Sequence, residues 1–184
     1  MDIYEIIKSR RSIRAFKTDN ISKDIIERIL DAAIWAPSAM NGQNWKFYVL
    51  SGEKRDQFAK LLFPVFEATR EKVLENYGPE GVELRRRLYS NAGGAPYVIV
   101  VYAEEGEWKR DLTGPGMACQ NILLAAKAEG LGSLFMGAVK NVKDEVSRFL
   151  GENDGELLGA ILIGYPDEDV EPKPRRDDRI TWVD

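Results

Sequence analysis

Four neighbouring residues near the N-terminus concentrate positive charge in a chain that is otherwise acidic. Arg10, Arg11 and Arg14 surround Ser12 in the run Arg-Arg-Ser-Ile-Arg, whereas the whole chain has a formal net charge of -4. Guanidinium groups present permanently charged donor forks that suit phosphate oxygens, and a serine hydroxyl adds a neutral hydrogen bond. The cluster therefore predicts a phosphate cradle. The alternative is a solvated basic helix end that offsets the helix dipole.

A polar loop is the second group of residues that could bind a ligand. It reads Ala-Pro-Ser-Ala-Met-Asn-Gly-Gln-Asn-Trp over residues 36–45, between an expected helix and an expected strand. Such loops place backbone N–H groups and amide side chains against a ligand while the flanking elements hold them still. Asn41 and Gln43 could instead bond local backbone groups, and Trp45 could belong to the core.

Taken together, these motifs resemble the nitroreductase family of FMN-dependent oxidoreductases, in which RRSxRxF is followed by APSxxNxQPW. Here the two motifs read RRSIRAF and APSAMNGQNW. Three further segments agree in order along the chain: Gln120-Asn121, the run GLGSLFMG over residues 130–137, and Gly164-Tyr165-Pro166 followed by a basic Lys173-Pro174-Arg175-Arg176. Asn44 departs from the pattern, which has proline there, and Asp177-Asp178 replaces a usual Pro-Leu.

The resemblance implies a role for each matching residue. One chain would hold the FMN phosphate and ribityl chain, and the partner chain would reach the same flavin through its polar loop. Backbone N–H groups would lie near flavin N5 and O4, and a basic pair from the C-terminal segment would close over the phosphate, with Arg176 as a neighbouring candidate. In that order, the implied residues are Arg10, Arg11, Ser12 and Arg14; Pro37, Ser38, Ala39 and Asn41; Met136 and Gly137; and Lys173 and Arg175.

The same resemblance implies an intertwined homodimer with FMN as cofactor and NADH or NADPH as co-substrate. Reducing equivalents would pass to a nitroaromatic, a quinone or a similar small organic acceptor by a ping-pong mechanism. Two alternatives remain open at this point: a specialised branch of the fold that performs flavin fragmentation or reductive dehalogenation, and a flavin carrier or redox-responsive binding protein. Fold alone does not decide among them.

Composition excludes several other classes of function. The chain has no histidine and one cysteine, Cys119, so Ser-His-Asp and Cys-His mechanisms, an internal disulfide and a thiolate zinc cluster are ruled out. No catalytic side chain is therefore predicted, because a bound organic cofactor would carry the chemistry. The acidic balance argues against nucleic-acid binding. The sequence shows no signal peptide and no run approaching about 20 apolar residues, so a cytoplasmic protein without a membrane segment is expected.

Hydrophobic patterning predicts helices and strands in alternation after two initial helices. Asp2 and Glu5 have capping-box spacing before the first helix, which should end near Arg10, and Ser22 can cap the second, which Pro37 stops. Strands are expected over residues 45–50, 97–102, 131–136 and 157–163. Helical spacing returns from Lys54 onward, and helices are expected over residues 58–90, with a break at Tyr77-Gly78-Pro79, and over 116–129 and 142–150.

This order predicts an α+β fold with a central, mostly antiparallel sheet flanked by helices, and the resemblance implies the nitroreductase-like FMN-binding fold. We expect residues 1–184 to form a single domain with an extended C-terminal segment. A Rossmann domain is disfavoured, because the glycine run at residues 130–137 follows a helix and lacks GxGxxG spacing.

Overall fold

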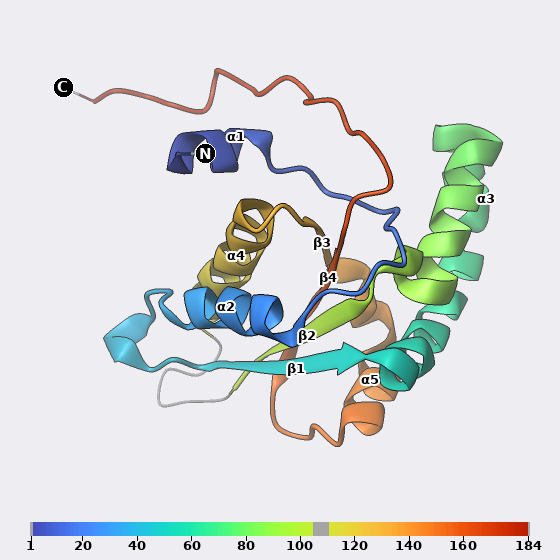
Figure 1. Cartoon of the computed structure of the whole chain (residues 1–184), viewed down its shortest axis with the longest axis horizontal. Helices are drawn as coiled ribbons and strands as arrows, with labels where there is room; N and C mark the ends of the chain where they lie inside the picture. Colours follow the sequence, from blue (N-terminus) through green and yellow to red (C-terminus); the bar gives the residue numbers. More distant parts are fainter. Residues whose placement is uncertain (1, 105–110, 184) are drawn as a thin grey trace.

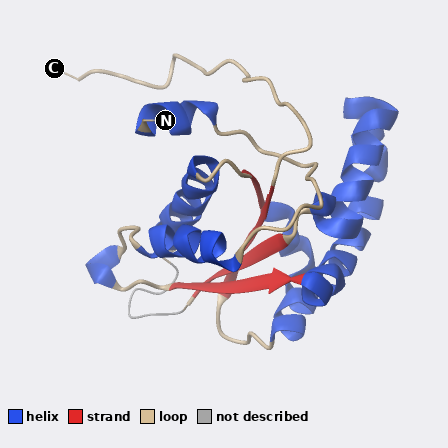
Figure 2. Ribbon diagram, in the orientation of Figure 1, coloured by secondary structure: helices blue, strands red, loops and turns tan. Residues whose placement is uncertain are grey.

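The computed structural model, which describes residues 2–104 and 111–183, is built around one four-stranded sheet. The strands are β1 (Trp45–Ser51), β2 (Tyr97–Ala103), β3 (Gly132–Met136) and β4 (Glu156–Gly164), in the order β1-β2-β4-β3. All three pairings are antiparallel. Figure 2 shows the strands at the centre with helices around them. The predicted α+β fold with an antiparallel sheet is confirmed.

The two inner strands separate two hydrophobic layers. Along β2, Val98, Val100 and Tyr102 belong to the core on the face covered by α3 (Gly52–Asn91) and α5 (Lys143–Leu150), as β2 residues alternate between the faces of the sheet. Ile99, Val101 and Ala103 belong to the core on the other face, under α2 (Lys23–Ile34) and α4 (Thr113–Ala128). Burial on both faces explains why this strand reads as an unbroken apolar run.

Local sequence signals account for the ends of several helices. In α1 (Ile3–Ser9), Asp2 accepts from the backbone N–H of Glu5 while Glu5 accepts from that of Asp2, which confirms the capping box. Ser22 stands at the N-cap of α2, but its side chain makes no capping hydrogen bond. The predicted break in α3 falls at Gly78, whose φ of 66° and ψ of -173° interrupt the helix. Short 3-10 turns cover Ala39–Asn41, Ala92–Gly94 and Gly137–Val142.

The long helix α3 and the C-terminal segment extend away from the sheet. Figure 1 shows α3 running past the sheet at one side of the molecule, while the chain after β4 turns back toward the side that carries α1. From residue 167 to residue 183, the last one that the structure describes, this segment forms no helix or strand. No helix among the described residues is both long and apolar enough to cross a lipid bilayer.

Candidate functional site

The arginine motif continues into a segment that lies across the ends of the sheet strands. Each backbone N–H from residue 13 to residue 17 has a partner: Ile13 donates to Ser133 O at 3.0 Å, Phe16 to Gly93 O at 2.9 Å and Lys17 to Tyr165 O at 2.9 Å. The N–H groups of Arg14 and Ala15 both donate to the carboxylate of Glu168. The backbone that carries the arginines is therefore fixed by three separate parts of the chain: Gly93, Ser133 and the segment 165–168.

Close packing of backbone on backbone holds the same segment from one side. Gly93 has a φ of +66°, and a Cβ added there would lie 2.2 Å from the carbonyl oxygen of Arg14. A Cβ added to Gly132 would meet the side chain of Ile13 at 2.9 Å. Larger residues at these two positions would force the arginine segment outward.

A pocket of about 300 Å³ opens beside this segment. Its lining combines three cations with polar groups and acidic residues, among them Arg10, Arg11, Lys127, Ser133, Glu168 and Glu171. Among the described residues, Ser9 Oγ and Arg11 Nε are buried without a hydrogen-bond partner. Burial, followed by the charges of Arg11 and Arg175, lowers the pKa of Arg10 below its ordinary value. Three cations and three carboxylates thus line one pocket, and its cations are the groups that could bind an anionic ligand.

The individual arginines are held differently. Arg11 Nη1 folds back onto the carbonyl oxygens of Lys8 at 2.7 Å and Arg10 at 2.8 Å, at the C-terminal end of α1. This contact is the one that the helix-end interpretation expects of a basic residue. Arg14 Nη1 donates to Ser12 O at 3.1 Å, and Ser12 forms a bridge with Ser133 at the start of β3. Arg10 makes no such local contact among the described residues and is the arginine most available to a ligand.

The other end of β3 carries Met136 and Gly137, whose backbone N–H groups are expected to lie near the flavin ring. Met136 is the last residue of the strand and Gly137 begins the following 3-10 turn. Three residues of extended strand separate Ser133 from Met136, or about 10 Å. An extended ribityl chain can bridge that span between a phosphate and a flavin ring. β3 lies at the edge of the four-stranded sheet, and among the described residues its outer edge is bridged to Ser12 and Ile13 at Ser133, so the edge open to a ligand is the part of β3 beyond Ser133.

The polar loop has an unusual backbone. Met40, Asn41 and Gln43 all have positive φ values, of 50°, 57° and 45°. The hydroxyl of Ser38 accepts from Gln43 N at 2.9 Å, and Asn44 Nδ2 donates to Asp111 O at 2.8 Å. Left-handed backbone at non-glycine residues is uncommon and occurs preferentially at ligand sites. Trp45 is buried in a small cluster with Ala36 and Ala118, so its core interpretation is confirmed.

The loop and the arginine segment lie at opposite ends of the sheet within one chain. The loop precedes Trp45, which pairs with Ala103 at one end of β1 and β2. The arginine segment contacts Ser133 and Pro166, at the end where Gly132 pairs with Gly164. A seven-residue strand such as β1 is about 20 Å long. Figure 1 shows the same separation, with the turn before β1 far from the chain that follows α1.

The basic residues of the C-terminal segment are exposed. Lys173 and Arg175 lie on the extended chain after β4, and Arg175 Nη1 donates to Lys173 O at 3.3 Å. The charge of Arg175 acts on Arg10, so these two guanidiniums lie near one another. Arg176 points to a different partner, because it forms a two-pronged ion pair with Asp178. The effect of the Arg175 charge on Arg10 and the ion pair of Arg176 with Asp178 therefore favour Arg175 over Arg176 as the residue that accompanies Arg10.

Comparison with known proteins agrees with this arrangement. The model of the nitroreductase family matches residues 7–165, which include the arginine motif, the loop and all four strands. The chain belongs to the nitroreductase family. A putative NADH dehydrogenase/NAD(P)H nitroreductase from Archaeoglobus fulgidus is 32% identical to this chain. The alignment covers 91% of this chain and 87% of the relative. An iodotyrosine deiodinase from Thermotoga neapolitana is 27% identical, and the alignment covers 94% of this chain and 91% of the deiodinase.

Solved structures of nitroreductases share the fold as well. A crystal structure of a nitroreductase with bound FMN from Desulfitobacterium hafniense is 26% identical, with a TM-score of 0.80 and full coverage of both chains. The FMN-dependent nitroreductase NfnB from Mycobacterium smegmatis, solved in complex with NADPH, has a TM-score of 0.81 at 22% identity. The superposition covers 98% of this chain and 97% of the NfnB chain.

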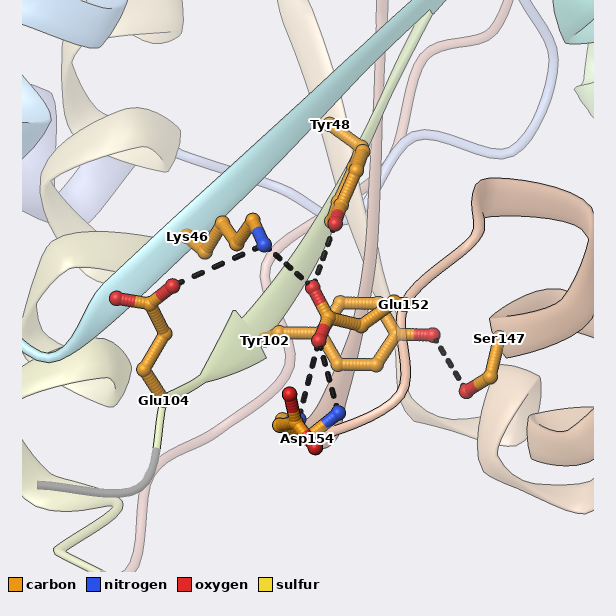
Figure 3. A network of polar contacts seen from close by, with 8 residues as sticks. Lys46, Tyr48, Tyr102, Glu104, Ser147, Glu152 and Asp154 are labelled. Atoms are coloured by element: carbon orange, nitrogen blue, oxygen red, sulfur yellow. Dashed lines mark hydrogen bonds and ion pairs between the residues drawn. The ribbon is translucent and has the colours of Figure 1, made fainter.

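Two acidic residues of the structure were not among the sequence-based candidates. Glu168 bonds the arginine segment from a distance of more than 150 residues along the chain. Glu152 lies at the centre of a network with Lys46 and Tyr48 of β1, which Figure 3 shows next to the Tyr102–Ser147 hydrogen bond. No local motif marks either glutamate. Only pairing of distant segments brings each to its partners.

Proposed function

We propose that this nitroreductase-family protein is an FMN-dependent oxidoreductase that passes reducing equivalents from NADH or NADPH to a small organic acceptor. The observation that carries the proposal is the pocket beside Arg10, which guanidinium groups of the arginine motif line, in a chain of net charge -4 whose sequence matches the family over both motifs. The names of the relatives support the redox chemistry, since they include NAD(P)H nitroreductases.

The pocket fits the phosphate end of FMN. The guanidiniums of Arg10 and Arg11 line it and supply positive charge, and Arg175 adds a further charge that acts on Arg10. A phosphate group offers oxygens to several donors at once. In this proposal Ser12 and Arg14 add contacts to the phosphate and to the adjoining ribityl chain, and Lys173 closes over the phosphate from the C-terminal segment.

The ring would lie at the far end of β3. When bound, FMN would accept a hydride from the nicotinamide nucleotide and return electrons to the acceptor. Backbone N–H groups of Met136 and Gly137 would orient the ring and stabilise negative charge on it. Donor and acceptor would use the same exposed face in turn, which predicts ping-pong kinetics. No side-chain acid or base is required of this chain.

The separation of the two motifs supports a homodimer. Since Pro37, Ser38, Ala39 and Asn41 lie at the opposite end of the sheet from Arg10, one flavin could contact both motifs only if the loop comes from a second copy. Large apolar side chains are also exposed on α1, beside the loop and in the C-terminal segment. They include Tyr4 at 70% exposure, Trp35 at 80% and Trp182 at 85%. Exposed aromatic side chains of this size would lose contact with water in a protein interface.

Reductive dehalogenation is a second candidate, favoured by the similarity to iodotyrosine deiodinase. It would use the same flavin site and differ in the acceptor. The two candidates predict different products with a halogenated phenol and with a nitroaromatic compound, so assays with both acceptors distinguish them.

The proposal is tested by an absorbance spectrum of freshly purified protein, identification of the released cofactor by mass, and anaerobic mixing with NADH or NADPH. We expect a flavin spectrum, FMN as the released compound, and rapid bleaching by one of the nucleotides. Double-reciprocal plots of the initial rate against nucleotide concentration, measured at several acceptor concentrations, should be parallel. A colourless protein that also fails to bind added FMN would refute the proposal, and bound FMN that neither nucleotide reduces would favour a flavin carrier.

A further inference from the structure

One side chain holds the middle of the arginine segment. Of the five N–H groups from Ile13 to Lys17, three donate to backbone carbonyls and two donate to the carboxylate of Glu168. The bond from Ala15 N measures 3.2 Å, and the same oxygen receives the N–H of Arg14. Glu168 is therefore the side chain that holds in place the residue carrying the Arg14 guanidinium.

The position of Glu168 along the chain adds a second connection. A short antiparallel pairing joins the two segments just before it, with Asp167 N donating to Ala15 O at 2.9 Å and Phe16 bridged to Pro166. Glu168 continues this pairing by one step through its side chain, where the backbone ladder ends. Five residues later the chain reaches Lys173, and then Arg175 beside Arg10. Glu168 thus ties the N-terminal cations to the segment that carries the C-terminal cations.

A carboxylate in this place is unfavourable for an anion site unless it has another purpose. Glu168 lines the same pocket as Arg10 and Arg11, and its negative charge would repel a phosphate there. Two charge-assisted hydrogen bonds to backbone N–H groups give it a positioning role that offsets this cost.

We propose that Glu168 is a positioning residue of the phosphate cradle: its carboxylate oxygen fixes the N–H groups of Arg14 and Ala15 and thereby aligns the cations of both chain segments on one phosphate. The inference rests on the proposed function, because it concerns the same FMN site. It adds that the location of an acceptor oxygen at Glu168, rather than its charge, determines phosphate recognition.

Two conservative variants separate location from charge. Glu168→Gln keeps an acceptor oxygen at nearly the same place and removes the charge, whereas Glu168→Asp keeps the charge and withdraws the oxygen by one methylene. Asp169→Asn is the control, because Asp169 lines the same pocket but makes no hydrogen bond to the arginine segment among the described residues. Each variant is measured for its dissociation constants with FMN and riboflavin, and for hydrogen exchange of the amides of residues 13–16 in flavin-free protein.

We expect Glu168→Asp to lower the preference for FMN over riboflavin by about 10-fold and to accelerate exchange at Arg14 and Ala15. Glu168→Gln should stay within about threefold of the wild-type preference, since the amide oxygen still accepts both bonds. Asp169→Asn should leave the exchange rates unchanged and should not weaken FMN binding.

The opposite ranking, with Glu168→Gln impaired and Glu168→Asp normal, would overturn the inference in favour of a charge effect. Faster exchange in Glu168→Asp with an unchanged FMN preference would also overturn it, because the bonds would then be purely structural. Wild-type protein that shows no preference for FMN over riboflavin would refute the proposed phosphate site itself, before any variant is compared.

Discussion

The carboxylate of Glu152, in the turn before β4, accepts a hydrogen bond at 2.7 Å from the ammonium of Lys46, near the start of β1. The same oxygen accepts from Tyr48 Oη at 2.5 Å, and the other oxygen accepts from the backbone N–H groups of Asp154 and Gly155. Glu152 is 6% exposed. These donors lower the pKa of its carboxyl group to about 2, with the bond from Lys46 as the largest cause.

This network predicts a stability that depends on pH. A carboxyl group whose folded pKa lies below its unfolded value stabilises the fold above the unfolded pKa, and loses that contribution as the pH falls through the folded pKa. For Glu152 the loss should occur between about pH 5 and pH 2. The contribution at neutral pH is at most about 3 kcal/mol, and water screens part of it because the Lys46 side chain is 42% exposed.

Glu152→Gln tests this expectation. The amide nitrogen would face the donors Lys46 and Tyr48, so we expect a loss of about 1–2 kcal/mol at pH 7 and a fall in Tm of about 2–8 °C. The Tm difference from wild type should shrink as the pH is lowered from 5 toward 3. Glu156→Gln, at an exposed glutamate four residues away, is the matched control and should change Tm little. A Tm difference that stays constant over this pH range would contradict the assignment.

Arg10→Ala should weaken FMN binding by about 10- to 100-fold, the cost of one charge-assisted hydrogen bond to the phosphate. Riboflavin lacks the phosphate, so its affinity should change little. Isothermal titration of flavin-free protein with both ligands measures the two effects. Arg86→Ala removes an equal charge from an exposed ion pair with Glu83 on α3 and should alter neither affinity. Equal weakening for both ligands would mean that Arg10 supports the fold instead of the phosphate.

Gly93→Ala should displace the arginine segment. The substitution places a side chain at a φ of +66°, which costs about 1–2 kcal/mol, and sets its Cβ against the carbonyl oxygen of Arg14. Gly151→Ala is the control, because Gly151 has a φ of +69° with no atom within 4 Å of the added Cβ. We expect Gly151→Ala to lower Tm by about 2–8 °C, and Gly93→Ala to lower Tm further and also weaken FMN binding. Similar losses in both variants would show that the segment can move aside without cost.

Sequence alone predicted those features whose causes are local. The Asp2–Glu5 capping box and the break at Gly78 each depend on a few adjacent residues, and both are present. The apolar run of β2 identified a strand covered on both faces, because burial of alternate residues on two sides removes the usual polar positions. Helical spacing was expected from Lys54 onward, and the helix begins two residues earlier, at Gly52, because its first residues are exposed and polar and have no hydrophobic pattern.

Features that depend on distant pairing were not predictable in this way. The position of β4 between β2 and β3 is set by tertiary packing, and nothing in the strand's own residues specifies its neighbours. The contacts of Glu152 with Lys46, and of Glu168 with Arg14, join residues more than 100 positions apart. Of the proposed site, the motifs supplied the residues, while the structure supplied the pocket at Arg10 and the distance between the arginine segment and the loop.

That distance leads to a prediction about mixed dimers. If each flavin site combines Arg10 of one chain with Asn41 of the other, a dimer of one Arg10→Ala chain and one Asn41→Gly chain has one site built from unaltered residues and one site with both changes. Glycine is chosen at residue 41 because it removes the amide yet accepts the φ of 57° observed there. Co-expression with two affinity tags isolates the mixed dimer, and we expect it to bind FMN at one of its two sites with wild-type affinity, whereas neither parent homodimer does.

The matched control combines Arg10→Ala with Arg175→Ala, two residues that lie close together in the same chain. In that mixed dimer every site carries one defect, so wild-type affinity should not return at any site. Restored binding in the control as well, or none in the Arg10–Asn41 mixture, would show that the loop and the arginine segment do not meet across a dimer interface.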